Sequence, residues 1–167
     1  MPDIVCVSKS ISGYGMPMAL TLIRPEYDVW RPDEHNGTLR SYNRAFVTAG
    51  RALETFWSDG ALQTRTTVLG ERASRSLTET ARLHGLATPR GRGLVWGLTL
   101  DRPGAAQEVC DAAYLAGLLL ETASLQDEAV KLLPPLTVTD EQLEQGLAVL
   151  DEAVASVAGV RDLAIRP

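Results

Sequence analysis

From Asp3 to Gly15, near its start, the chain reads Asp-Ile-Val-Cys-Val-Ser-Lys-Ser-Ile-Ser-Gly-Tyr-Gly, and this segment is the most informative about the architecture. Residues 4–7 are apolar and mostly β-branched, which predicts a short strand that is buried on both faces. The strand leads to a single lysine, Lys9, in a segment of serine and glycine. Small residues there allow a tight turn and the close approach of a ligand. The stretch therefore predicts a buried strand that ends at a functional lysine.

Lys9 is a candidate nucleophile. A lysine at the end of a buried strand is poorly hydrated, and a desolvated amine is a usable nucleophile. The chain has 16 basic residues, of which only Lys9 and Lys131 are lysine. Arginine cannot be deprotonated in proteins and so cannot react as an amine, whereas lysine can. The alternative is a surface lysine beside a turn, but a chain that uses arginine for its surface charge favours the reactive role.

The pattern around Lys9 resembles a known signature. Residues 3–13 have the order Asp-Ile-Val-x-x-Ser-Lys-x-x-Ser-Gly, which is similar to the pyridoxal-phosphate lysine signature of class III aminotransferases. Residues 13–20 and the later Glu-His-Asn-Gly-Thr at 34–38 most resemble the diaminobutyrate–2-oxoglutarate transaminases of the ectoine pathway. The resemblance runs over nearly the whole chain. It implies an α/β fold, the PLP-dependent transferase fold type I, present in part.

Two domains follow from the resemblance. Residues 1–58 would form the C-terminal part of the large PLP-binding domain, and residues 59–167 would form the small C-terminal domain. The sequence of the second part is typical of a two-layer α/β domain, because strands alternate with amphipathic helices.

The resemblance also implies roles for three residues. Lys9 would bind pyridoxal 5'-phosphate as an imine and then move a proton, and Lys131 would bind the substrate carboxylate. Thr38 would reach the cofactor phosphate of the neighbouring subunit of a homodimer. A turn threonine that caps its own loop, and a strand-edge lysine with its head in water, stay open as alternatives. Relatives usually have Gly-Asn shortly after the threonine; this chain has Ser41-Tyr42, and the bulky tyrosine could crowd the phosphate.

The family's phosphate-cradling loop and ring-nitrogen aspartate match nothing in this sequence. We therefore expect the C-terminal portion of such an enzyme, inactive alone, that binds the cofactor weakly or not at all. The complete enzyme is expected to transfer an amino group from glutamate to aspartate semialdehyde, giving 2,4-diaminobutyrate and 2-oxoglutarate. Two alternatives remain: another class III ω-amino acid transaminase, acting on ornithine or 4-aminobutyrate, and a non-catalytic remnant that folds without cofactor.

Composition narrows the remaining possibilities. With 45% hydrophobic and 22% charged residues, the chain of 167 residues is typical of a globular protein. A net charge of −5 argues against a nucleic-acid partner, and the lack of an apolar run of about 18 residues argues against a membrane span. Cys6 and Cys110 lie in apolar contexts and predict buried, reduced thiols of a cytoplasmic protein. His35 and His84 are not spaced with other ligands, which predicts no metal site.

Periodicity predicts the other elements. A second strand is expected at 19–23, and helices are expected at 45–56 and 62–81, the latter with a solvated charged face. The Arg-Gly-Arg-Gly run at 90–93 leads into an apolar strand at 94–98. A helix at 109–114 should end at Gly117, followed by strands at 118–121 and 129–133. Thr139 and Gln142 form a capping box that begins the last helix.

Overall fold

The computed structural model describes residues 2–13, 16–34, 37 and 42–164, and side chains as far as residue 158. The chain divides into two compact units, residues 1–62 and 63–167, and each is described by itself. The domain boundary expected from the sequence lies between residues 58 and 59. The assignment of these units to a large and a small domain stays a prediction.

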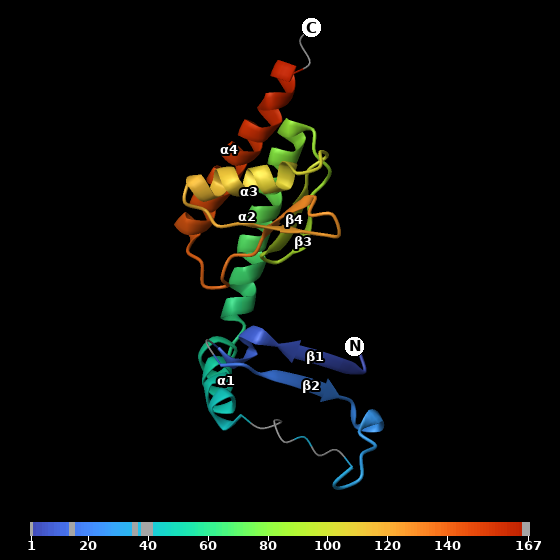
Figure 1. Cartoon of the computed structure of the whole chain (residues 1–167). Coiled ribbons are helices and arrows are strands. Elements are labelled where there is room, and N and C mark those ends of the chain that lie inside the picture. Colours follow the sequence, from blue (N-terminus) through green and yellow to red (C-terminus); the bar gives the residue numbers. More distant parts are fainter. Residues whose placement is uncertain (1, 14–15, 35–36, 38–41, 165–167) are drawn as a thin grey trace. The chain divides into compact units, whose positions relative to one another are not determined.

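The first unit contains a two-stranded antiparallel sheet and one helix (Figure 1). Strands β1 (Ile4–Ser8) and β2 (Ala19–Ile23) pair with Ile4 opposite Ile23 and Ser8 opposite Ala19. Two short 3₁₀ helices, η1 (Lys9–Ser12) and η2 (Pro25–Tyr27), follow the strands, and helix α1 (Asn43–Phe56) packs mainly against η1. Both strands lie where the sequence predicted them.

The predicted burial of the first strand is wrong for this chain. Ile4 is 53% exposed, and its partner on the second strand, Ile23, is 37% exposed. Cys6 is exposed as well, whereas Cys110 is buried as expected. The physical reason is that β1 packs mainly against β2 and η1, so among the described residues no layer of helices covers the two faces of this small sheet.

The second unit contains a four-stranded antiparallel sheet with helices packed on one face (Figure 1). Most of helix α2 (Ala61–His84) belongs to it. The other elements, in chain order, are β3 (Arg90–Arg92), β4 (Val95–Thr99), α3 (Ala105–Leu115), β5 (Glu121–Ala123), β6 (Ala129–Leu132) and α4 (Asp140–Ala164). The strand order is β3-β4-β6-β5.

One hydrophobic core holds the second unit together. The apolar stripe predicted on α2 contributes Leu69, Ala73, Leu77 and Ala81, all buried. The remaining buried core residues come from β4, β6, α3, α4 and their connections: Leu94, Leu98, Leu100, Ala105, Ala106, Val109, Cys110, Ala113, Val130, Leu132, Val138, Leu143, Leu147, Leu150, Ala153 and Val154. Leu98, Val130 and Leu132 lie on one face of the sheet, since residues two apart on a strand share a face. The arrangement is the two-layer α/β architecture that the sequence predicted.

Both predicted helix ends of this unit are confirmed. The Thr139 N–H donates to Oε1 of Gln142 at 3.1 Å, and the Gln142 N–H donates to Oγ1 of Thr139 at 3.2 Å. This reciprocal pair is a capping box, which satisfies two backbone donors at the start of α4. Gly117, just after α3, has a φ of 88°, the left-handed conformation that favours glycine at this position.

Three details differ from expectation. Strand β5 begins at Glu121 rather than at residue 118, and Arg90–Arg92 forms a strand, β3, that was not predicted. The charged face of α2 is not wholly solvated. Nη2 of Arg65 lies 2.9 Å from Oδ1 of Asp140, and Nη1 of Arg72 lies 2.6 Å from Oδ2 of Asp140. These ion pairs join α2 to the first turn of α4.

Candidate functional site

Lys9 stands at the point where strand β1 ends and η1 begins. Its φ is +60°, a left-handed conformation that is uncommon for a residue with a side chain. Such strained residues cluster at functional sites, where the surrounding structure holds them. The Lys9 side chain is exposed, so the poor hydration expected from the sequence is wrong for this chain, because the strand that leads to it is itself exposed. The Lys9 amine makes no hydrogen bond or ion pair with another described residue. The structure thus presents a primary amine that no described neighbour engages.

Two small residues after Lys9 hold its turn. Ser12 is 1% exposed, and its hydroxyl lies against the backbone carbonyl of Met16 and within 3.5 Å of the carbonyl oxygen of Lys9. Gly13 has a φ of 83°, and a Cβ at this position would lie 3.4 Å from Cβ of Ala52 in α1. A buried serine hydroxyl and a glycine in close approach to a helix are ways of fixing a turn. They hold the backbone that presents Lys9.

These features fit an aldehyde cofactor such as pyridoxal phosphate. Covalent attachment of an aldehyde requires a primary amine that is accessible and is not held in an ion pair. Lys9 meets both conditions among the described residues. Small neighbours such as Ser10, Ser12 and Gly13 leave room for a ring beside it.

Thr38 and Ser41, which the sequence placed near the cofactor phosphate, lie outside the described residues. Tyr42, the residue that could crowd the phosphate, is described at the start of α1. It is 42% exposed, and its hydroxyl lies 3.5 Å from Sδ of Met16. The phosphate-binding role of Thr38 therefore stays a prediction.

Lys131 belongs to the second unit, on strand β6. Its Nζ lies 2.7 Å from Oε2 of Glu121, the residue directly opposite on β5. The Lys131 side chain is 32% exposed and that of Glu121 is 71% exposed. The hydrogen bond from Lys131 holds the pKa of Glu121 below its usual range. The sequence-based interpretation of Lys131 as either a carboxylate ligand or a free surface lysine missed this partner.

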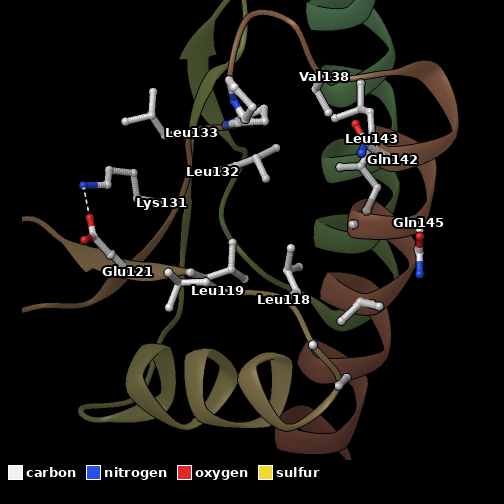
Figure 2. A pocket seen from close by; sticks show the side chains of 18 residues that line it. Leu118, Leu119, Glu121, Lys131, Leu132, Leu133, Val138, Gln142, Leu143 and Gln145 are labelled. Atoms are coloured by element: carbon white, nitrogen blue, oxygen red, sulfur yellow. Dashed lines mark ion pairs between the residues drawn. The ribbon is translucent and has the colours of Figure 1, made fainter. Parts of the chain in front are cut away.

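A hollow of about 620 Å³ lies beside this ion pair. Its lining comes from the end of α3, the segment before β5, the end of β6, the loop that follows and the first turns of α4. Figure 2 shows Leu132, Val138 and Leu143 around the hollow, while Lys131 and Glu121 point away from the helix that carries Gln142. The lining of the hollow includes both partners of this ion pair, Lys131 and Glu121, beside its apolar residues.

The part of the chain that the structure describes lacks two further kinds of feature. No helix there is both long and apolar enough to cross a membrane. No group of three or more histidine, cysteine, aspartate or glutamate side chains is arranged to bind a metal ion.

The chain combines an accessible lysine that directly follows a strand with a two-layer α/β unit. This combination is consistent with the family to which the sequence matches. The family model described as aminotransferase class-III matches residues 1–154. The chain belongs to the class-III aminotransferase family.

Relatives with curated names narrow the similarity. The chain is 55% identical over 157 residues to the diaminobutyrate–2-oxoglutarate transaminase of Nocardia farcinica (strain IFM 10152), covering 93% of this chain and 36% of the relative. It is 49% identical over 158 residues to the protein of the same name from Streptomyces anulatus, covering 95% of this chain and 38% of that relative. The chain therefore spans less than two fifths of the length of these relatives. The sequence-based resemblance is confirmed.

Solved structures agree on the fold. An acetylornithine aminotransferase from Elizabethkingia anophelis superimposes with a TM-score of 0.81 at 25% identity, over 93% of this chain and 41% of that one. The ornithine aminotransferase from Toxoplasma gondii ME49 superimposes with a TM-score of 0.84 at 24% identity, over 96% of this chain and 38% of that one. The predicted α/β fold of a class III, PLP-dependent aminotransferase is confirmed.

Proposed function

We propose that this chain is the C-terminal part of an aminotransferase that moves an amino group from glutamate to aspartate semialdehyde, giving 2,4-diaminobutyrate and 2-oxoglutarate. The observation that carries the proposal is the identity of 55% and 49% to two proteins named diaminobutyrate–2-oxoglutarate transaminase. The accessible, strained Lys9 supports it, because the chemistry needs an amine at this place.

Lys9 would hold pyridoxal 5'-phosphate covalently through Nζ. Bound there, the cofactor supplies an electron sink for the substrate carbon that loses a proton. With its Nζ free and unprotonated, Lys9 would accept that proton and return it. The left-handed backbone at Lys9, beside the buried Ser12 and the close approach of Gly13 to α1, would set the direction in which the side chain leaves the chain.

Two further residues complete the proposed site. Thr38 would donate its hydroxyl to the cofactor phosphate, across the interface of a homodimer of the complete enzyme. Lys131 would bind a substrate carboxylate. A lysine offers a point charge without the two parallel hydrogen bonds of arginine, so this contact tolerates more than one carboxylate geometry. We propose the same division of the chain as expected from the sequence, with residues 1–58 belonging to the cofactor domain and 59–167 to the small domain.

A chimera tests the proposal. This chain replaces the matching 36% of the Nocardia farcinica relative, and the purified chimera is assayed with glutamate and aspartate semialdehyde. We expect 2-oxoglutarate and 2,4-diaminobutyrate in equal amounts. The Lys9→Arg variant keeps the positive charge, but arginine cannot form an imine with the cofactor aldehyde. This substitution should lower the rate of amino-group transfer by at least about 10³-fold.

The same assay separates the alternatives. A chimera that prefers ornithine or 4-aminobutyrate as amino donor over glutamate with aspartate semialdehyde would contradict the proposed substrates while leaving the reaction class intact. A folded, dimeric chimera without transfer activity toward any of these would support a non-catalytic remnant. The parent relative, assayed in parallel, controls for the conditions.

A further inference from the structure

One row of residues crosses the four-stranded sheet of the second unit on a single face. Arg90 of β3 pairs with Gly97 of β4, Gly97 pairs with Lys131 of β6, and Lys131 pairs with Glu121 of β5. Directly opposed residues of antiparallel strands place their side chains on the same face. The row therefore presents a cation, a gap, a second cation and a carboxylate, in that order.

This face is opposite the hydrophobic core. Leu98, Val130 and Leu132, which alternate with the row along β4 and β6, are buried under the helices. Arg90 is exposed, and Gly97 and Lys131 are partly exposed. A small molecule can thus reach the row without entering the core of the unit.

Gly97 is not required by the backbone. Its φ lies outside the left-handed region, and a Cβ added there would meet nothing closer than the carbonyl oxygen of Arg90 at 3.8 Å. A glycine inside a strand lowers stability, because it loses more conformational freedom on folding than other residues. Strand glycines often mark a place where a ligand or another backbone approaches closely. Neither a left-handed φ nor a close backbone contact accounts for the glycine at position 97.

The spacing of the row suits a carboxylate above Gly97. Neighbouring strands lie about 4.8 Å apart, so the Cα atoms of Arg90 and Lys131 are separated by about 10 Å. Both side chains are long enough to reach a group halfway between them. Each cation also has an acidic neighbour. Glu121 binds Lys131. Glu128 has a pKa below its usual range, mainly through hydrogen bonds from its own and nearby groups, with a smaller attraction from Arg90.

We propose that Arg90 and Lys131 together bind a carboxylate of a small organic acid over Gly97, and that Glu121 competes with this carboxylate for Lys131. The proposal rests on the proposed function only in taking Lys131 as a substrate-carboxylate ligand, and it adds Arg90, Gly97 and Glu121 as residues that determine specificity. Because the Glu121 carboxylate offsets part of the charge of Lys131 and repels an incoming carboxylate, the row favours acids that also engage Arg90.

The test measures binding directly on the 167-residue chain. Backbone amide spectra by NMR are followed while glutarate is added, with uncharged glutaramide as the matched ligand control. We expect a saturable shift of the Gly97 and Lys131 amides with glutarate and none with glutaramide. No saturable shift with glutarate, or an equal response to both compounds, would overturn the proposal.

Variants assign the effect to residues. Arg90→Gln and Lys131→Gln should each weaken glutarate binding by about tenfold, since each removes a charge-assisted hydrogen bond. Arg92→Gln makes the same charge change on the same strand, but Arg92 lies opposite Val95 in the next row, so it should change the affinity by less than about twofold. An Arg90→Gln effect no larger than that of Arg92→Gln would refute the role of Arg90.

Two variants act in opposite directions. Glu121→Gln releases Lys131 and should tighten glutarate binding by about threefold or more. Gly97→Val keeps every charge but fills the gap, and should abolish the shift while thermal melting shows a folded unit. Unchanged binding in Gly97→Val, or weaker binding in Glu121→Gln, contradicts the proposal. The readout is binding, so an inactive chimera would refute the aminotransferase function without affecting this result.

Discussion

The two units of the chain differ in how they are stabilised. In the second unit, a single core of 20 buried residues joins three helices to one face of a sheet. In the described part of the first unit, the buried residues are Ala45, Ala49 and Ser12, while large apolar side chains such as Val47 and Trp57 are exposed. The candidate cofactor lysine is in this sparsely packed unit. The second unit is therefore stabilised by a hydrophobic core of its own. Lys9, in contrast, is presented by a β-hairpin and one helix that bury few side chains.

The largest expected effect comes from the core itself. Leu69→Ala removes a side chain that is 1% exposed and should lower the free energy of unfolding of the second unit by about 2–5 kcal/mol. Leu53→Ala in α1 removes a side chain that is 45% exposed and should cost less than about 1 kcal/mol. Urea unfolding measured by Trp96 fluorescence, in a background where Trp30 and Trp57 are phenylalanine, reports on the second unit. Trp57 fluorescence, in a background where Trp30 and Trp96 are phenylalanine, reports on the end of α1 in the first unit, so each loss is measured in the unit that carries the substitution. Equal losses would remove the contrast between the units.

Two glycines within helices of the second unit differ in how closely they are packed, and substituting them should change stability less than Leu69→Ala. A Cβ at Gly70 of α2 would overlap the backbone of Gly93, so Gly70→Ala should destabilise the second unit by about 1–3 kcal/mol. Gly146 of α4 has only an ordinary contact, 3.6 Å from Cδ1 of Leu118.

The matched substitution Gly146→Ala should therefore stabilise the unit by about 0.5–1 kcal/mol, because alanine favours a helix. Thermal melting of both variants checks the prediction. If Gly70→Ala also stabilised the unit, the close approach of α2 to the β3–β4 turn would be wrong.

The capping box gives a third, smaller effect. Thr139→Ala removes the hydroxyl that accepts the Gln142 N–H and should cost about 1 kcal/mol. Thr139→Ser keeps that acceptor and should restore most of the loss. The exposed neighbour Thr137, changed to alanine, serves as the control and should be neutral within about 0.5 kcal/mol. A loss in Thr137→Ala as large as that in Thr139→Ala would contradict the cap.

The smallest effect is the pH dependence of the ion pairs between α2 and α4. The hydrogen bond from Arg65, with further attraction from Arg72, holds the pKa of Asp140 below its ordinary value of 3.8. A carboxyl whose pKa is lowered in the folded state makes its full contribution to the stability of the fold when the pH is above the pKa of the unfolded chain. This contribution is lost as the pH falls through the pKa of the folded state. Unfolding of the second unit should therefore become easier as the pH drops below 3.8.

The Asp140→Asn variant tests this sign. It should be less stable than the parent at neutral pH, and its stability should fall less steeply in the acid range. Asp33→Asn, which removes a carboxyl from the first unit, controls for the change in net charge. A parent and an Asp140→Asn variant with the same acid profile would show that the ion pairs add nothing measurable.

The sequence predicted the elements whose pattern is local. The 3.6-residue stripe of α2, the capping box of α4 and Gly117 after α3 follow from neighbours within a few positions, and the structure confirms them. Strand β3 was missed because Arg-Gly-Arg has no apolar alternation. It forms through its pairing with β4, which periodicity alone does not reveal.

The same distinction applies to the candidate site. Lys9 is a candidate that the sequence offers because its strand and its small neighbours are adjacent to it, and its role stays a prediction. The partner of Lys131 was missed because Glu121 lies ten residues away and meets it only through the register of β5 with β6. The ion pairs of Arg65 and Arg72 with Asp140 join residues 75 and 68 positions apart, so the charged face of α2 looked solvated from its own composition.

The central claim is that Lys9 is the residue that binds the cofactor. The most direct measurement reduces the chimera with borohydride in the presence of pyridoxal phosphate and locates the modified lysine by peptide mass spectrometry. We predict modification of the peptide that contains Lys9, at a stoichiometry close to one per chain, and its loss in Lys9→Arg. Stoichiometric modification at Lys131, or at a lysine of the Nocardia farcinica part with Lys9 unmodified, would contradict the claim.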